Sequence, residues 1–351
     1  MSALRSGITT GTCAAAAAQA AAGVLCGHPA PKQVELSLPD DRLLSVPVLY
    51  ARGTDCGSMA AVRKDAGDDP DVTDGMEVVV SLTEIDAPVI EFVAGEGVGT
   101  VTKPGLQIAP GQPAINPVPR EMITRAIRQI TDRPLRVEVS IPGGDTAALS
   151  TFNPRLGIVG GLSVLGTTGI VRPYCRRAVQ DTISCALNVA AACGVTAPVL
   201  VPGNIGAAAA REHFTPSEEQ VVEVANQWGF ALDQLTARRF SAVMLLGHPG
   251  KLAKLAAGQW DTHSSHSESA AGLVGRIASQ ILPEPPQHSE TVEGIFNSLS
   301  AEGRDRLGNE VARRVSAVVE QRTEIALPIS TFLVNMAGER LGTNGDLTPW
   351  Q

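Results

Sequence analysis

The feature that most constrains this chain is a glycine-rich apolar stretch that runs from Asn153 to Cys175. It contains five glycines among residues typical of a buried strand, namely Gly157, Gly160, Gly161, Gly166 and Gly169. Glycine weakens a strand and is found there where another backbone or a ligand comes close. The stretch therefore predicts either bends that line a ligand or tight turns between short buried strands.

Four stretches of the chain together carry a resemblance to one protein family. The first is Arg-Leu-Gly-Ile-Val-Gly-Gly-Leu-Ser-Val-Leu-Gly-Thr-Thr-Gly-Ile-Val at 155–171. The others are Arg-Ser-Gly-Ile-Thr-Thr-Gly-Thr-Cys and five alanines at 5–18, Gly-Glu-Gly-Val-Gly-Thr-Val-Thr-Lys-Pro-Gly at 95–105, and Gly-His-Pro-Gly-Lys-Leu-Ala-Lys at 247–254 with Asp-Thr-His-Ser at 261–264. In this order they resemble the CbiD-type cobalt-precorrin-5B C1-methyltransferases of anaerobic cobalamin biosynthesis.

The resemblance implies methylation of ring carbon C1 of cobalt-precorrin-5B, which gives cobalt-precorrin-6A. The implied methyl donor is S-adenosyl-L-methionine, and the implied substrate is a cobalt-containing tetrapyrrole with many carboxylate arms. Transient contacts with other enzymes of the pathway are a further expectation. Two places depart from the family pattern: Gln19 stands where lysine is frequent, and Arg172-Pro-Tyr-Cys175 replaces an acidic-Pro-Met-Ser run.

Composition limits the classes to which the chain can belong. At 351 residues it is long enough for two domains. A net charge of −8 and an aromatic content of 3% argue against a nucleic-acid partner. No segment is long and apolar enough for a membrane span, and Gln19 interrupts the alanine run that could be mistaken for a signal peptide. We therefore expect a cytoplasmic protein with no membrane partner.

Residues 1–150 are expected to form an α+β domain. Alanine favours a helix within residues 4–27, with Thr10 or Thr12 as its cap and Gly27 at its stop. Alternating apolar and polar residues around 34–38, 44–48 and 78–82 predict antiparallel strands. A helix that begins near Pro117 and a strand over 135–141 complete this domain.

Residues 151–351 are expected to form an α/β domain with a mostly parallel, doubly wound sheet, because short apolar runs alternate with helical segments. The predicted strands are 156–159, 197–201, 241–246 and 329–334. The predicted helices are 174–193, a segment from the capping box at 215–218 to Gly229, and one around 307–318. The prolines at 283–286 predict a linker.

Ligands of doubly wound sheets bind at the carboxyl ends of the strands, and three predicted strands end in glycine-bearing loops. These loops begin at Gly160, Pro202 and Gly247, and we expect them to converge on one cofactor pocket. The residues predicted to bind the cofactor are Gly160, Gly161, Gly166, Thr167, Thr168, Gly203 and Asn204.

Basic residues and a helix start predict where the anionic substrate binds. Thr9 and Thr10 open the alanine-rich helix, whose N-terminus attracts anions, although plain capping explains them too. Arg176 and Arg177 stand in the first turn of the helix near 174, where the helix dipole disfavours cations unless an anion binds. The alternative is that they turn outward, with Arg177 reaching Asp181. The residues predicted to bind substrate are Thr9, Thr10, Lys103, Arg155, Arg176 and Arg177.

His248, Asp261 and His263 are the predicted catalytic residues, because they suit proton transfer or hydrogen bonding to a substrate carboxylate. Ordinary surface polarity is the alternative. No metal site is expected, because the six cysteines form no CxxC pair and the aspartates of 65–74 lack an ordered metal-binding spacing.

Two other functions stay open beside the methyltransferase. The first is a non-catalytic corrinoid-binding or scaffold protein of the same pathway. The second is a deacylating hydrolase that uses His263 or Cys13, whose place at a helix N-terminus would lower its thiol pKa.

Overall fold

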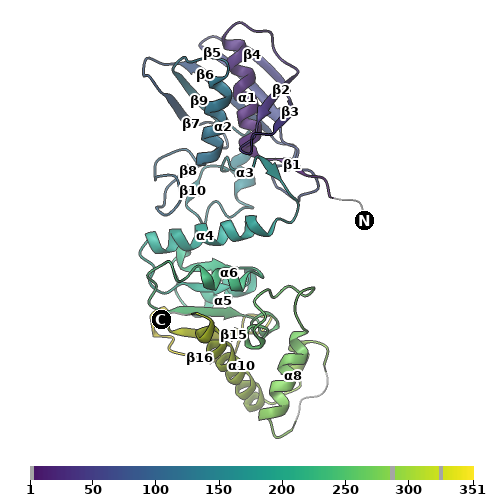
Figure 1. The fold of residues 1–351 in the computed structure, drawn as a ribbon. Helices are drawn as coiled ribbons and strands as arrows, with labels where there is room; N and C mark the ends of the chain where they lie inside the picture. The colour runs from purple at the N-terminus through teal and green to yellow at the C-terminus, as the bar shows by residue number, and fades with distance from the viewer. Residues whose placement is uncertain (1–3, 285–288, 324–326) are drawn as a thin grey trace. The chain divides into compact units, whose positions relative to one another are not determined.

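Two compact units make up the chain, Met1–Cys175 (unit 1) and Arg176–Gln351 (unit 2) (Figure 1). The structure is a computed structural model and describes residues 4–284, 289–323 and 327–351. Each unit has its own hydrophobic core. Both units mix helices with strands, and parallel and antiparallel pairing both occur, which confirms the expected mixed α/β class. The predicted linker at 283–286 lies partly outside the described residues.

Unit 1 is built from one mainly antiparallel sheet, two longer helices and several short strand pairs. Its elements are β1 (Gly7–Ile8), α1 (Thr10–Leu25), β2 (Gln33–Ser37), β3 (Leu43–Pro47), β4 (Tyr50–Thr54), β5 (Gly57–Arg63), β6 (Glu77–Glu84), β7 (Ile90–Ala94), β8 (Thr100–Val101), α2 (Pro117–Arg128), β9 (Leu135–Ser140), α3 (Gly144–Ala148), β10 (Ile158–Val159) and β11 (Ile170–Val171). The predicted strands and both long helices are confirmed.

Helix α1 lies in the centre of unit 1, and its alanines explain why. Most of its side chains are fully buried, and they contact β5, β6 and α2. Because a methyl group is the largest side chain over most of its length, the helix can approach its neighbours closely. The hydroxyl of Ser58 on β5 donates to the Ala21 carbonyl at 2.7 Å. The N-cap is Thr9 rather than Thr10 or Thr12, since its side chain accepts from the Thr12 N–H.

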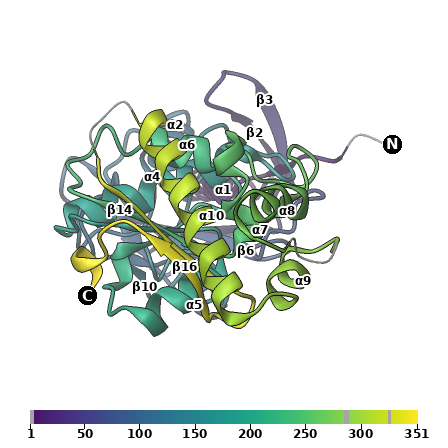
Figure 2. The same ribbon diagram turned by 90° about the horizontal axis from the view of Figure 1, so that it is seen from below.

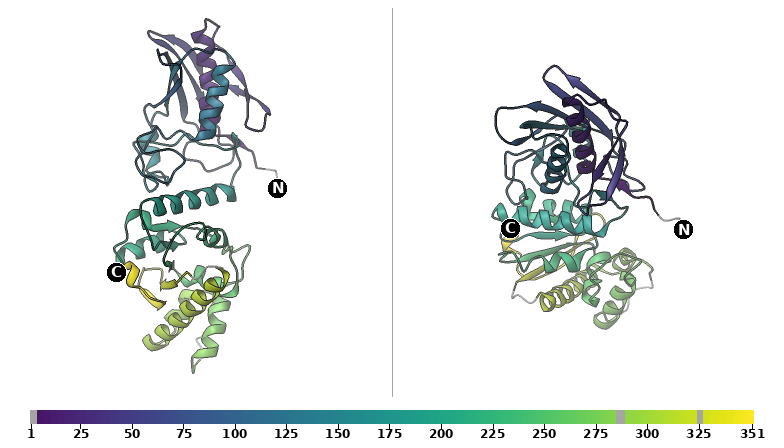
Figure 3. Two further views of the ribbon diagram at one scale, coloured as in Figure 1. Left: turned by 60° about the vertical axis from the view of Figure 1, so that its left-hand side comes forward. Right: turned by 45° about the horizontal axis from the view of Figure 1, so that its top comes forward.

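The sheet of unit 1 has the strand order β4-β5-β6-β9-β7. Its pairs are antiparallel except β7 with β9, which is parallel. Figure 3 shows α1 and α2 packed against one face of this sheet. The hairpin β2–β3 covers α1 from another side, with Val34, Leu36 and Val46 buried.

The glycine-rich stretch belongs to unit 1, which corrects the expected domain boundary near residue 150 and the expected place of the 156–159 strand. Within that run only Ile158–Val159 is strand, and it pairs antiparallel with β8, while β11 pairs with β1. The stretch also exchanges backbone hydrogen bonds with the loop at 97–99: Gly99 N–H donates to the Leu162 carbonyl and Leu162 N–H to the Gly97 carbonyl, both at 2.9 Å. The chain therefore divides at Cys175, because residues 153–171 are tied to N-terminal partners.

Unit 2 contains one five-stranded sheet with helices on both faces. Its elements are α4 (Arg176–Ala192), β12 (Val199–Val201), α5 (Asn204–His213), η1 (Glu218–Gln220), β13 (Val221–Glu223), α6 (Trp228–Asp233), β14 (Val243–Gly247), α7 (Pro249–Leu252), η2 (Leu255–Ala257), α8 (Ala270–Ile281), α9 (Val292–Asn297), α10 (Ala301–Arg322), β15 (Ile329–Val334), β16 (Arg340–Asn344) and η3 (Thr348–Trp350).

The strand order in unit 2 is β13-β12-β14-β15-β16. The first four strands are parallel and β16 is antiparallel to β15. Alternate residues of β14 enter different cores: Val243 and Leu245 pack with α4, α8 and α10, whereas Met244 and Leu246 pack with α5. Figure 2 shows α10 running across β16, and α5 contacts β12 and β14.

The helix predicted from the capping box to Gly229 is wrong. Residues 218–220 form a single 3₁₀ turn whose capping box is Ser217 with Gln220, and β13 follows at once. Val221 and Val222 pair with Val199 and Leu200 of β12. Tertiary pairing thus overrides the local helical pattern, which β-branched valines support only weakly.

Candidate functional site

The carboxyl ends of the parallel strands in unit 2 lie at one edge of the sheet. The chain leaves β12 into Gly203, β13 into a turn with Asn226, β14 into His248 and β15 into a turn with Met336. The order in which strands are added to the sheet reverses at β12, because the chain continues to β13 on one side of it and then to β14 on the other. Such a switch point is where parallel sheets commonly bind ligands.

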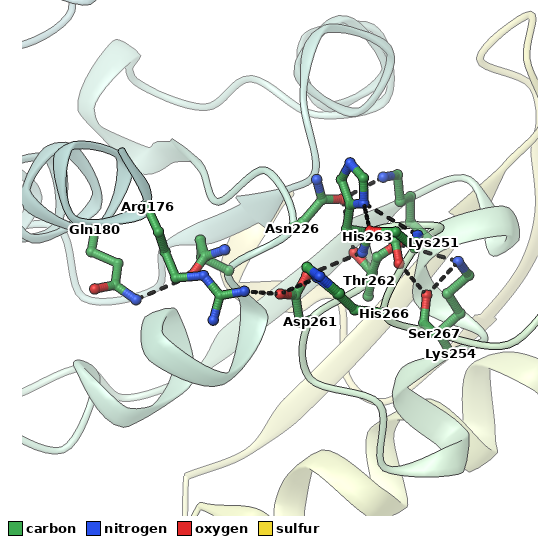
Figure 4. Close-up of polar contacts among 12 residues, drawn as sticks. Arg176, Gln180, Asn226, Lys251, Lys254, Asp261, Thr262, His263, His266 and Ser267 are labelled. Atoms are coloured by element: carbon green, nitrogen blue, oxygen red, sulfur yellow. Dashed lines mark hydrogen bonds and ion pairs between the residues drawn. The ribbon is translucent and has the colours of Figure 1, made fainter. Parts of the chain in front are cut away.

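A group of polar side chains lies at this edge around Asp261, as Figure 4 shows. We call it the Asp261 cluster, and it comprises Arg176, Asn226, Lys251, Lys254, Asp261, His263 and His266. Its members come from α4, α7, the turn between α7 and η2, and the loops after β13 and η2. Asp261 is placed by an isolated backbone bridge to Gln227, whose side chain accepts from Gln180 of α4 at 3.1 Å.

The Asp261 carboxylate is the acidic centre of this cluster. One oxygen, Oδ2, accepts from the Arg176 guanidinium and lies 3.3 Å from Nδ1 of His266. The other, Oδ1, accepts from the His263 backbone N–H at 3.1 Å. Burial raises the pKa of Asp261, but the His263 N–H, Arg176 and His266 together lower it below its ordinary value. The carboxylate is therefore charged at neutral pH and orients Arg176.

Lys251 and Lys254 extend the cluster, and the sequence analysis did not single them out as functional. Lys251 Nζ donates to Oδ1 of Asn226. Lys254 Nζ donates to the Thr262 carbonyl at 3.2 Å and to the Ser267 hydroxyl at 2.7 Å. A signal was available: the chain has only five lysines, and two of them stand in 247–254.

His263 is exposed, and its contacts are local. Its Nδ1 lies 2.7 Å from the Ser265 hydroxyl and accepts from the Ser265 backbone N–H at 3.2 Å. Its ring lies beside that of His266, with 5.6 Å between the centroids. Because Nδ1 is held as an acceptor, Nε2 carries the proton of the neutral ring and can donate to a ligand.

A pocket of about 390 Å³ lies at the same edge of the sheet, beyond the end of β14. Its polar lining comes from His248, Ser269, Glu290, Thr291 and Glu293. Its apolar lining includes Ala270, Ala271, Val292 and Met336. This volume falls within the range of roughly 300–1,000 Å³ that small-molecule sites occupy.

His248 holds one wall of this pocket. Its Nδ1 accepts from the Gly250 N–H at 2.9 Å, which caps α7, and its Nε2 lies 3.1 Å from Oε2 of Glu293. Since Nδ1 is an acceptor, Nε2 carries the proton and donates it to Glu293. Both nitrogens are thus engaged within the protein, and these contacts link α7 to α9. The predicted catalytic part of His248, in proton transfer or in hydrogen bonding a substrate carboxylate, stays a prediction.

Gly203 and Asn204 lie at this edge as predicted from the sequence, where β12 leads into α5. Asn204 is the first residue of α5 and is exposed. A Cβ added to Gly203 would meet no atom within 4 Å, so the space beside it is open.

The other residues predicted to bind the cofactor lie in unit 1. Gly160 and Gly161 therefore do not follow a strand of the unit 2 sheet, as the sequence analysis expects them to. Gly161 packs on the backbone of Gly97, and Gly166 packs against Thr9. Gly160 and the side chains of Thr167 and Thr168 are exposed. The glycines at 161 and 166 are therefore explained by close approach of other parts of unit 1.

Thr9 and Thr10 are buried and bonded to the glycine-rich stretch. The Thr10 hydroxyl accepts from the Leu165 N–H at 3.0 Å, and the Thr9 N–H donates to the Gly169 carbonyl at 3.1 Å. The Gly11 N–H likewise donates to the Leu165 carbonyl at 3.0 Å. The start of α1 thus binds protein backbone, which corrects the anion site expected there.

The remaining residues predicted to bind substrate fall in both units. Lys103 lies against Gly157, and the Arg155 guanidinium lies over the Phe152 ring, 5.7 Å from its centroid, in unit 1. Arg176 and Arg177 are in the first turn of α4, as expected, and both are exposed. Of these, Arg176 is the one that joins the Asp261 cluster.

Cys13 is fully buried in α1, and burial raises the pKa of its thiol to about 12. This overturns the lowered pKa expected at a helix N-terminus and removes the nucleophile of the cysteine-dependent hydrolase.

We predict that Cys13 stays unmodified when the native protein is treated with iodoacetamide at pH 8, because only a thiolate reacts and access is blocked. Peptide mass spectrometry measures the extent of labelling at each cysteine, and exposed Cys56 is the internal control that becomes labelled. Equal labelling of both cysteines would contradict the burial of Cys13.

Within residues 4–284, 289–323 and 327–351, no helix is long and apolar enough to cross a membrane. In the same residues, no three histidine, cysteine or acidic side chains come together as a metal site.

Comparison with known proteins agrees with the motifs. The family model described as CbiD matches residues 1–173, and the model described as CbiD, C-terminal domain, matches 261–345. A relative from Syntrophotalea carbinolica, named cobalt-precorrin-5B C(1)-methyltransferase, is 52% identical over 100% of both chains. A protein of the same name from Alkaliphilus metalliredigens is 38% identical over 95% of this chain and 90% of its own.

A solved structure also matches, described as a cobalamin biosynthesis protein (cbiD) from Archaeoglobus fulgidus, with 30% sequence identity and a TM-score of 0.41. The match covers 74% of this chain and 82% of that chain. On the identity to full-length relatives and the two family models, the chain belongs to the CbiD family.

Proposed function

We propose that this protein transfers the methyl group of S-adenosyl-L-methionine to C1 of cobalt-precorrin-5B and so forms cobalt-precorrin-6A. The observation that carries the proposal is the 52% identity, over all 351 residues, to a relative named for C1 methylation of this substrate. When bound, the donor supplies a methyl group on a sulfonium, which an electron-rich ring carbon can accept without an enzyme nucleophile. The protein then has to hold the two molecules in line and exclude water.

We place the methyl donor at the carboxyl edge of the unit 2 sheet, which we take to be doubly wound. The pocket beside His248 fits such a ligand in size and lining. Carboxylates at Glu290 and Glu293 can accept hydrogen bonds from ribose hydroxyls and attract a sulfonium cation, while Ala270 and Ala271 offer apolar surface to adenine. Gly203 and Asn204 approach from the end of β12.

The macrocycle is assigned to the Asp261 cluster. Arg176 and the Nε2–H of His263 can bind carboxylate arms, and Asp261 holds Arg176 in place. A charged hydrogen bond of this kind contributes about 1.5–3 kcal/mol. In this scheme the protein acts chiefly through position, so His248, Asp261 and His263 hold groups in place. Roles for Lys103, Arg155 and Arg177, a cytoplasmic location and contacts with pathway enzymes stay predictions.

The proposal is tested by incubating the full chain with S-adenosyl-L-methionine and cobalt-precorrin-5B and following both products by mass spectrometry. We expect a macrocycle that has gained one methyl group, with one S-adenosylhomocysteine formed for each. Binding of the macrocycle without S-adenosylhomocysteine would favour the scaffold function. Loss of an acyl fragment without methylation would favour the hydrolase.

A further inference from the structure

Two lysines of the Asp261 cluster form no ion pair with an acidic side chain in the described residues 4–284, 289–323 and 327–351. Lys254 is only 6% exposed, and its Nζ bonds to a carbonyl and a hydroxyl. Lys251 is half-buried, and its Nζ bonds to the Asn226 amide oxygen. In the part of the chain that the structure describes, neither ammonium has a carboxylate within ion-pair distance.

The same chain treats another buried lysine differently. Lys64 in unit 1 is 2% exposed, and its Nζ forms an ion pair with Asp71 at 2.6 Å. A buried charge is unfavourable unless a counterion offsets it, which Asp71 does for Lys64. Lys254 is buried almost as deeply and has no such partner among the residues that the structure describes, so those residues do not explain its position through the stability of the fold.

The two lysines also act on each other. Burial lowers the pKa of Lys251, and the charge of Lys254 lowers it further, against a smaller opposing effect of Asp261. Burial lowers the pKa of Lys254 as well. Asp261 forms no ion pair with either lysine among the described residues, and its oxygens already bond to Arg176, His266 and the His263 N–H. The cluster therefore has a surplus of cations in a chain whose net charge is −8.

The surplus positive charge lies at the edge of the sheet where a ligand is expected. Lys251 is in α7, which follows β14 directly, and Asn226 follows β13, so both lie at the carboxyl edge of the parallel strands. His248, at the start of the same short helix, lines the pocket. A molecule that fills the pocket can thus extend one group along α7 toward Lys251.

We propose that Lys251 binds a carboxylate group of the ligand at this edge, with Lys254 supplying a second charge beneath it and Asn226 holding the Lys251 ammonium in place. The inference rests on the proposed function, which offers two sources of that carboxylate. One is the amino-acid end of the methyl donor, and the other is an acetate or propionate arm of the macrocycle. An ammonium–carboxylate contact of this kind is charge-assisted and strong when partly buried.

The test measures equilibrium binding to the full chain by titration calorimetry. The probes are S-adenosylhomocysteine, its decarboxylated analogue and cobalt-precorrin-5B. The variants are Lys251→Met and Lys254→Met, with Lys251→Arg as the charge-preserving variant. Lys32→Met is the control, because Lys32 is an exposed lysine of unit 1.

We expect Lys251→Met to weaken binding of one carboxylate probe by about tenfold or more, Lys254→Met to weaken it less, and Lys251→Arg to restore most of it. If binding of S-adenosylhomocysteine weakens while binding of its decarboxylated analogue does not, the donor supplies the carboxylate. If only binding of cobalt-precorrin-5B weakens, the macrocycle supplies the carboxylate. Both results support the proposal.

Binding of all three probes within twofold of the wild type in both methionine variants would overturn it. That failure differs from a failure of the proposed function, in which the wild-type protein itself would bind neither the donor product nor the macrocycle. Thermal unfolding serves as the check on folding. Lys251→Met removes one partly exposed hydrogen bond and should change the stability of unit 2 little, whereas Lys254→Met also removes the bonds to the Thr262 carbonyl and the Ser267 hydroxyl and should lower it modestly without unfolding the protein.

Discussion

Replacing Gly161 with alanine is expected to lower the free energy of unfolding of unit 1 by about 3 kcal/mol. A Cβ at this position would lie 2.3 Å from the Gly97 carbonyl oxygen and 2.4 Å from its carbonyl carbon. Backbone on both sides must then move apart, and the hydrogen bond from Leu162 N–H to the Gly97 carbonyl lengthens. For a unit of this size the melting temperature should fall by about 6–12 °C, as calorimetry can measure.

Gly160→Ala is the matched control, one residue away. Gly160 has a φ of +85°, and a Cβ there would meet no atom within 4 Å. The substitution therefore carries only the left-handed backbone penalty of roughly 1–2 kcal/mol. If Gly161→Ala left stability unchanged but abolished binding of S-adenosylhomocysteine, Gly161 would be a cofactor residue as the sequence predicts, and its structural explanation would be wrong.

Asp261→Asn is expected to lower kcat/KM for methyl transfer by about 100-fold, because losing the hold on Arg176 would shift the bound macrocycle, and a shift of about 1 Å can have an effect of this size. The amide would release Arg176 from its ion pair and weaken the hold on His266, while the fold depends little on these partly exposed contacts. The free energy of unfolding should change by less than about 1 kcal/mol. Steady-state kinetics and calorimetry on the same preparation separate the two effects.

Asp305→Asn, which changes an exposed aspartate of α10, serves as the control and should retain wild-type turnover. Arg176→Ala should reproduce most of the defect of Asp261→Asn, and the double variant should be little worse than either, because the two residues act as one unit. Full activity of Asp261→Asn would show that the carboxylate is ordinary surface polarity, the alternative left open by the sequence.

Local sequence patterns were sufficient to predict the long helices and strands. The alanine run, the start at Pro117 and the apolar spacing near Leu307 predicted α1, α2 and α10, because a helix satisfies its backbone within its own segment. The alternation in 78–82 predicted β6 for a similar reason: period-two burial shows in the sequence even though the partner strand does not. The four motifs were enough to indicate the family.

Partners far apart in the sequence were not predictable in the same way. The run 156–159 has the composition of a core strand, but its pairing with β8 depends on residues about 57 positions earlier, so it was assigned to the wrong sheet. The glycines beside it correctly indicated a close approach, yet the approaching group at Gly161 is the Gly97 backbone. Val221 and Val222 became strand because β12 was available to pair with them.

The candidate site likewise has features that the sequence predicts and features that depend on the tertiary structure. The sequence by itself indicated the family and the reaction that it implies, and it placed Gly203, Asn204 and His248 at strand ends of the second sheet. Only the tertiary structure decided that both nitrogens of His248 are engaged and that Cys13 is inaccessible. It also decided that Lys254 is buried with no carboxylate partner in the described part of the chain. The physical reason is that burial and charge compensation depend on which distant side chains surround a group, whereas motif identity and periodicity are written along the chain.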